Sequence, residues 1–289
     1  MSFVNKNRGE TAFQILATLF FTCVCLICLI PVINIAAISF SAKNAILSGQ
    51  VFLLPVGFTI SAYKQTLSNG GFLFSFQYSI LLTILHASLA MTLTVLCAFP
   101  LSKKDLPGKN AFMAVILVTM YFTPGVIPGY LNIKSLGLLD TIWALALPGA
   151  VNAYNVIIMR SFFTGIDENM YDAAYIDGAR HGRALASIAI PLAAPCIATL
   201  SLFYAVGRWN GVNDVIFYIT DPRLYTAQMK LKQMMESADV GREEGALAVL
   251  TAESVKAAAI MISMSPMLAL YPFIHKYFTR GIMLGAIKG

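Results

Sequence analysis

Residues 165–179 read GIDENMYDAAYIDGA, a polar run that carries the signals of a short helix. Asp167 is a good N-cap residue because its carboxylate can accept a hydrogen bond from a first-turn amide, and Glu168 adds negative charge where the helix dipole favours it. Gly178 suits the left-handed backbone position that ends a helix, and a second helical stretch is predicted at 181–188. The sequence therefore predicts a structured loop here rather than a simple connector.

Long apolar segments lie on both sides of this loop. A membrane-spanning helix needs about 20 predominantly apolar residues. The windows that meet this length are 13–38, 74–100, 111–131, 139–163, 194–219 and 257–278. The chain is 58% hydrophobic and 12% charged, with a mean hydropathy of +0.73, whereas soluble domains carry about 25% charged residues. Lipid must therefore cover much of the surface, and the predicted fold is all-α, a polytopic membrane protein with six transmembrane helices.

Lysine and arginine residues are unevenly distributed between the segments that join these windows. With the N-terminus inside, the cytoplasmic segments hold eleven of them: Lys6, Arg8, Lys103, Lys104, Lys109, Arg160, Arg180, Arg183, Lys276, Arg280 and Lys288. The outer segments hold eight over a greater length: Lys43, Lys64, Lys134, Arg223, Lys230, Lys232, Arg242 and Lys256. Because basic residues are enriched in cytoplasmic loops, both termini are predicted to be cytoplasmic.

The predicted domain organisation follows from these windows. Residues 1–12 form a cytoplasmic N-terminus, residues 13–278 the transmembrane domain, and residues 279–289 a cytoplasmic C-terminal tail. Within the transmembrane domain, 165–191 is a cytoplasmic loop and 220–256 is an external loop.

Several classes of function lack their sequence signals. The net charge of +6 is spread between apolar blocks and makes no basic stripe, so nucleic-acid binding is not expected. Cys25 and Cys28 form a C-x-x-C pair, but no second pair or nearby histidine accompanies them, and a structural role is favoured over a metal site. No Walker-type glycine-rich loop is present, and no nucleophile stands with a base. We therefore expect no catalytic residues, no metal and no bound cofactor in this chain.

Polar residues inside the apolar windows are functional candidates because burying them is costly. The candidates for lining a pathway are Asn152, Tyr154, Asn155, Trp209 and Asn210. Asn152, Tyr154 and Asn155 either line a pathway or bond to neighbouring helices. Trp209 either stacks on the transported molecule or anchors at the membrane interface. Arg208 either pairs with Asp214 or serves the pathway.

Two further features of the windows predict local structure. His86 is alone in its window, so packing is favoured over a proton relay. Pro124, Gly125, Pro128 and Gly129 predict a broken or kinked helix in the third window.

The cytoplasmic loop also resembles a known motif. The run Asp172-Ala173-Ala174-x-x-Asp177-Gly178-Ala179, followed by Ile188-x-Ile190-Pro191, resembles the E-A-A-x-x-D-G-A…I-x-L-P motif of ABC importer permeases. Asp172 stands where glutamate is usual, and Ile190 where leucine is usual. In that family the loop couples the permease to the ATPase subunits, so the resemblance implies an ATPase-coupling role for Asp172, Ala173, Ala174, Asp177, Gly178, Ala179 and Pro191.

The rest of the chain is similar to carbohydrate importer permeases of the maltose-permease type. The residues that carry this similarity are Trp209-Asn210, Tyr218 to Asp221, Tyr271-Pro272-Phe273, and the tail segments 277–281 and 285–289. Within that group the chain most resembles the second permease of importers for oligosaccharides or polysaccharide fragments.

This resemblance implies the type I importer transmembrane fold and a set of partners. The partners are a second, homologous permease, two ATP-binding subunits that use ATP and Mg, and an external solute-binding protein. The resemblance also implies that Gly241, Glu243, Glu244 and Gly245 contact the binding protein, and that the C-terminal tail contacts the ATPases. The expected location is the cell (inner) membrane.

The function expected from the sequence is therefore a permease subunit, not itself an enzyme, that moves a carbohydrate by alternating access. The alternative is an ion-coupled secondary transporter, which normally has buried acidic or histidine relays and paired repeats; these are poorly represented here. A polytopic membrane enzyme would need clustered catalytic residues, and none is visible in the sequence.

Overall fold

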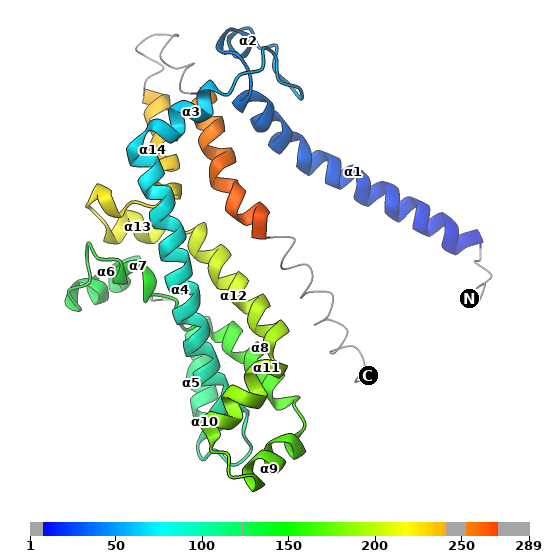
Figure 1. Cartoon of the computed structure of the whole chain (residues 1–289), viewed down its shortest axis with the longest axis vertical. Helices are drawn as coiled ribbons and strands as arrows, with labels where there is room; N and C mark the ends of the chain where they lie inside the picture. Colours follow the sequence, from blue (N-terminus) through cyan, green and yellow to red (C-terminus); the bar gives the residue numbers. More distant parts are fainter. Residues whose placement is uncertain (1–7, 123, 241–252, 271–289) are drawn as a thin grey trace. The chain divides into compact units, whose positions relative to one another are not determined.

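A computed structural model describes residues 8–122, 124–240 and 253–270, and the regular secondary structure within these ranges is entirely helical (Figure 1). The chain divides into two units. One comprises Met1–Gly70 with Leu231–Met264, and the other Gly71–Lys230 with Ser265–Gly289. The all-α prediction is confirmed for the described residues.

The first unit begins with the long helix α1, Arg8–Ser39. Its apolar stretch Phe13–Ser39 is long enough to span a membrane, and its most apolar 18 residues include no buried one, as expected for a helix that faces lipid or another chain. Near the C-terminal end, Ala37 and Ser39 are buried. After α1 come the short helices α2, Lys43–Leu47, and α3, Ser61–Ser68.

The second unit contains the loop and the other polar residues singled out in the sequence. Its elements are α4 (Gly70–Ser102), α5 (Lys109–Tyr121), α6 (Val126–Ser135), α7 (Trp143–Ala146), α8 (Ala153–Thr164), α9 (Glu168–Ile176), α10 (His181–Ala184), a π-helical turn (Leu185–Ala189), α11 (Ile190–Leu192), α12 (Ala194–Trp209), α13 (Asn213–Tyr218) and a 3-10 turn (Pro222–Leu224). Helix α14, Ala227–Val240, and the helix Glu253–Leu270 each extend across the boundary between the units.

The helices that could span a membrane agree in part with the predicted windows. Among the described residues, Phe13–Ser39, Gly70–Ser102 and Glu253–Leu270 are long and apolar enough. Two bent pairs, α5 with α6 and the segment His181–Leu192 with α12, raise the number to five if each pair is one span. The break that the proline and glycine residues predict in the third window is confirmed, since α5 ends at Tyr121 and α6 begins at Val126.

Two windows were wrong as continuous helices. In 139–163, α7 is only four residues long, and Pro148 and Gly149 (φ 74°) separate it from α8. In 194–219, α12 ends at Trp209 and α13 begins at Asn213. Both windows are apolar enough on average, but proline cannot donate the helical hydrogen bond and glycine readily adopts backbone conformations that end a helix.

Helix α4 connects two apolar cores of the second unit. Near its C-terminal end, Phe99 and Leu101 pack with residues of α8, α9 and α12. Nearer its N-terminal end, Tyr78 and Leu82 pack with residues of α7 and α13. The long cyan helix in Figure 1 therefore joins the surroundings of α9 to those of α13.

Candidate functional site

The motif loop folds as the sequence predicts. The Asp167 side chain accepts a hydrogen bond from the Asn169 amide at 3.1 Å and caps α9. Gly178 ends the helix with φ 80°, while the Gly178 and Ala179 amides donate to the Tyr175 and Ala174 carbonyls. This arrangement satisfies carbonyl groups that a helix end leaves without partners.

Helix α9 has one buried face and one exposed face. Tyr171 is 3% exposed and belongs to the core. On the other face, Ile176 is 86% exposed and Met170 is 46% exposed, with Ala173 exposed between them. Large apolar side chains on a helix outside the apolar spans form a surface suited to a protein partner.

The residues predicted to couple to an ATPase lie on this helix or follow it. Asp172, Ala173, Asp177 and Gly178 are exposed, Ala174 and Ala179 are half-buried, and Pro191 is exposed in α11. The structure thus brings the first six together at the exposed side and the C-terminal end of α9. Pro191 belongs to the segment that leads into α12, where the chain bends by 82°.

Two lysines that follow α4 contact α9, and no pattern in the sequence indicates this contact. Lys104 Nζ lies 2.6 Å from Glu168 Oε2, and this hydrogen bond raises the pKa of Lys104 and lowers that of Glu168. Lys103 Nζ lies 3.1 Å from the centroid of the Tyr171 ring. A cavity of about 360 Å³ is lined by both lysines, Glu168 and Tyr171 among other residues.

A second polar site lies where α12 breaks before α13. A cavity of about 400 Å³ is found there. Its lining residues are His86, Pro148, Gly149, Gly207, Arg208, Asn210, Gly211, Val212, Asn213 and Asp214. The backbone is irregular here, and such backbone is tolerated at membrane depth where it is buried in protein or lines a cavity.

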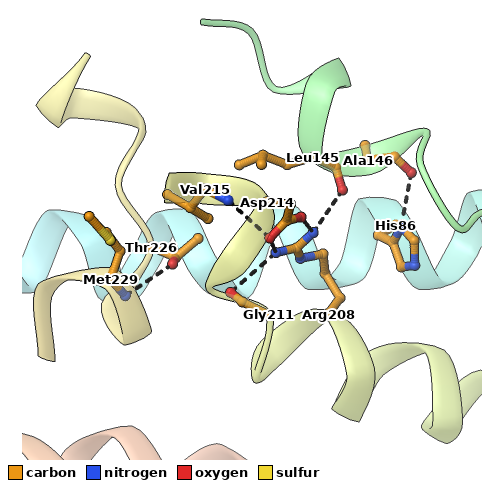
Figure 2. A network of polar contacts seen from close by, with 9 residues as sticks. All are labelled: His86, Leu145, Ala146, Arg208, Gly211, Asp214, Val215, Thr226 and Met229. Carbon is orange, nitrogen blue, oxygen red and sulfur yellow. Dashed lines mark hydrogen bonds and ion pairs between the residues drawn. The ribbon is translucent and has the colours of Figure 1, made fainter. Parts of the chain in front are cut away.

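Arg208 is the centre of the polar network at this break (Figure 2). It forms an ion pair with Asp214, as one of the two sequence hypotheses proposed, and its Nη2 donates to Asp214 Oδ1 at 3.0 Å. Its Nη1 also donates to the Leu145 carbonyl at 3.0 Å, and Nη2 donates to the Gly211 carbonyl at 3.3 Å. The side chains of Arg208 and Asp214 are 6% and 23% exposed, so the pair is largely removed from solvent.

Helix α7 explains why polar side chains gather at this place. Because α7 ends after one turn, its last carbonyl groups have no helical partners. Arg208 bonds to Leu145, and His86 Nδ1 lies 2.9 Å from the Ala146 carbonyl oxygen (Figure 2). The contact of His86 with a backbone carbonyl supports the packing role that the sequence favoured.

The residues predicted to line a pathway do not all meet in this cavity. Asn210 lines it, whereas Trp209 is 3% exposed and packs edge-to-face on Phe76 with ring centroids 5.8 Å apart. Asn152 caps α8 through the Asn155 amide, and Asn155 itself is 5% exposed. Tyr154 is 53% exposed. The cavity lining also includes Asn213 and Asp214, of which the sequence analysis considered only Asp214, as a possible partner of Arg208.

Asp140 is a structural residue that the sequence reasoning missed. It adopts a left-handed conformation (φ 55°), which aspartate tolerates better than most residues. Its carboxylate accepts hydrogen bonds from the Thr220 hydroxyl at 2.7 Å and from the amides of Thr220 and Asp221 at 2.5 and 3.0 Å. The segment Tyr218 to Asp221 was a possible signal for Asp140, since backbone amides that follow the end of α13 need hydrogen-bond acceptors.

Some of the predicted contact and motif residues fall outside the part of the chain that the structure describes. Gly241, Glu243, Glu244 and Gly245 lie outside the described residues, and so do Tyr271 to Phe273 and the tail. Among the residues that the structure describes, no group of three or more His, Cys, Asp or Glu side chains could hold a metal ion.

Known proteins are similar in sequence to this chain along nearly its whole length. It is 36% identical to Protein LplC of Bacillus subtilis (strain 168) over 289 residues, which cover 99% of this chain and 98% of that protein. It is 37% identical to the polygalacturonan/rhamnogalacturonan transport system permease protein YtcP of the same organism, covering 98% and 100%. No protein-family model matches the chain.

A solved structure has the same fold. It is the crystal structure of a bacterial ABC transporter involved in the import of the acidic polysaccharide alginate. One of its chains matches with a TM-score of 0.88 and 34% sequence identity, and the match covers 95% of this chain and 99% of that one.

Proposed function

This chain belongs to the permease subunits of carbohydrate ABC importers, and on that premise we propose that it carries a fragment of an acidic polysaccharide across the cell (inner) membrane. Permease subunits of this family are not enzymes, and a separate subunit is the ATPase. ATP and Mg are used on that subunit, so this chain needs no cofactor of its own.

The observation that carries the proposal is the polar cavity beside the break between α12 and α13. Its lining includes the amide side chains of Asn210 and Asn213 with Arg208 close to them. Amides can donate to and accept from sugar hydroxyls. The Arg208 guanidinium is already bonded to Asp214 and to the Leu145 and Gly211 carbonyls, so the acidic class of the sugar is supported by the similar proteins and not by Arg208. Of the similar proteins, one is a permease for polygalacturonan and rhamnogalacturonan, which contain uronic acid, and another belongs to an importer of alginate.

The proposed topology has six spans with both termini in the cytoplasm. Five spans come from the three long helices and the two bent pairs. Residues 139–164, which contain the α7 turn and the 12-residue helix α8, together supply the sixth. The distribution of lysine and arginine then puts α9 on the cytoplasmic side, where ATP is available.

The proposed assembly is a heterodimer with a second permease, two ATPase subunits and an external solute-binding protein. The exposed face of α9, with Met170, Ala173 and Ile176, is the proposed docking surface for one ATPase subunit. The proposed contact with the binding protein is made by Gly241, Glu243, Glu244 and Gly245. Asn152, Tyr154, Asn155 and Trp209 remain candidates for the pathway in other states of alternating access.

The substrate class is tested by ATP hydrolysis in the complete transporter with its binding protein. A uronate-containing oligosaccharide should stimulate hydrolysis about tenfold more than a neutral oligosaccharide of the same length. A tenfold difference corresponds to about 1.4 kcal/mol of binding free energy. Equal stimulation by both sugars contradicts the acidic substrate. Stimulation by the neutral sugar alone does so as well.

A further inference from the structure

The C-terminal end of α4 contacts α9 through an aromatic cluster beside the Lys103 ammonium group. Lys103 Nζ lies 3.1 Å from the ring centroid of Tyr171 and 5.1 Å from that of Phe99. The Phe99 ring lies 6.2 Å from the Tyr171 ring and packs edge-to-face on Phe163 at 5.8 Å. Side chains from α4, α8 and α9 therefore meet beside the Lys103 side chain.

Burial makes this cation–π contact strong. Tyr171, Phe99 and Phe163 are 3%, 5% and 2% exposed. Lys103 is half-buried, and burial lowers the pKa of its ammonium group. A cation over an aromatic face gains more when it is partly removed from water.

The neighbouring ion pair is a weaker link. Lys104 and Glu168 also connect the end of α4 to α9, but their side chains are 75% and 52% exposed. Exposed ion pairs are screened by water and salt and contribute little. The two adjacent lysines therefore form a natural comparison, with Lys103 as the stronger link.

Helix α9 is short, and the contact with α4 rests on few of its residues. It is nine residues long and has one buried residue, Tyr171. Glycines stand at both of its ends: Gly165 precedes its capping residue and Gly178 follows its last turn. Tyr175 also packs partly against this core, and its hydroxyl shares a 3.0 Å hydrogen bond with His181 Nδ1, which connects α9 to α10. The buried contact between α9 and the end of α4 is therefore made at Tyr171.

Helix α4 extends from this link to the cavity beside Arg208. His86 on α4 lies 2.9 Å from the Ala146 carbonyl oxygen and lines that cavity. Thr94, also on α4, shares a 2.7 Å hydrogen bond with the Tyr204 hydroxyl of α12. A displacement passed from α9 to α4 would therefore reach His86 on α4 and, through Tyr204, helix α12, and both helices contribute residues to the cavity lining.

We propose that Lys103 is a positioning residue that fixes α9 to α4 through the Tyr171 ring, so that motion of α9 is passed to the transport cavity. The proposal rests on the proposed function, because it takes α9 to be the surface that docks on the ATPase. It assigns no contact between Lys103 and substrate, and none between Lys103 and the ATPase.

The test compares variants of the complete transporter, with its binding protein, in lipid vesicles. The quantity measured is the amount of sugar taken up per ATP hydrolysed, with co-purification of the ATPase as a check on assembly. Lys103→Met keeps the apolar stem and removes the charge, and it should lower this ratio about tenfold while assembly persists. Lys103→Arg keeps a cation over the ring and should restore the ratio. Lys104→Met removes the exposed ion pair and should lower the ratio less than about twofold.

Changes of Tyr171 separate the ring from its hydroxyl group. The Tyr171 hydroxyl is buried and has no hydrogen-bond partner, so Tyr171→Phe should keep the ratio. Tyr171→Leu removes the aromatic face and should lower the ratio of sugar taken up to ATP hydrolysed, as Lys103→Met does. An unchanged ratio in Lys103→Met, or an equal loss in Lys104→Met or Tyr171→Phe, overturns the proposal. Failure of the unaltered transporter to take up any sugar would instead overturn the proposed function.

Discussion

Changing Asp172 to lysine is expected to abolish uptake and to weaken association of the permease with its ATPase by about 100-fold. Reversing one charge of an interfacial pair replaces attraction with repulsion. Asp172 is exposed on α9, next to the exposed Ala173. A carboxylate beside small residues can approach a basic partner closely and form a charged hydrogen bond. Association is measured by titrating the purified ATPase onto the permease in detergent.

The matched control is Asp172→Glu. Glutamate is the usual residue at this place of the family motif, so this variant should bind the ATPase and transport at least as well as the natural chain. The role assigned to Asp172 is wrong if the lysine variant binds the ATPase and takes up sugar normally.

Changing Arg208 to methionine is expected to destabilise the protein by about 3–5 kcal/mol, the range for breaking a buried ion pair by removing one partner. The change leaves the Asp214 carboxylate largely buried without its counterion. It also leaves the Leu145 and Gly211 carbonyls without the bonds that Arg208 donates. Thermal unfolding in detergent, with loss of transport as a second readout, measures the effect.

Two comparisons make the Arg208 result specific. The double variant Arg208→Met with Asp214→Leu removes both charges and should recover part of the lost stability. Arg223→Met breaks the pair with Asp221, in which the arginine side chain is 85% exposed, and should change stability little. A double variant less stable than Arg208→Met, or an equal loss in Arg223→Met, would show that charge burial is not the cause.

Local signals in the sequence were sufficient for the motif loop. Asp167 caps α9 and Gly178 ends it because these effects depend on residues within one turn of the helix. The helices Phe13–Ser39 and Gly70–Ser102 were also predictable, since hydropathy alone identifies long unbroken apolar segments.

The breaks and the long-range contacts were harder to predict. The mean hydropathy of a window stays high when the window includes Pro148 and Gly149, so it does not predict the end of α7. Lys103 meets Tyr171 and Asp140 meets Thr220 only because helices distant in the sequence pack together. Burial of Trp209 against Phe76 has the same origin.

Uptake by sealed vesicles shows whether ATP hydrolysis or an ion gradient drives this transporter. Vesicles that hold this chain with its partner permease and ATPase subunits are given binding protein and a labelled uronate oligosaccharide, with either ATP at the ATPase side or an imposed proton or sodium gradient. We predict accumulation with hydrolysable ATP, and none with a gradient alone. Accumulation driven by a gradient without ATP would contradict ATP-driven transport and identify the chain as an ion-coupled transporter.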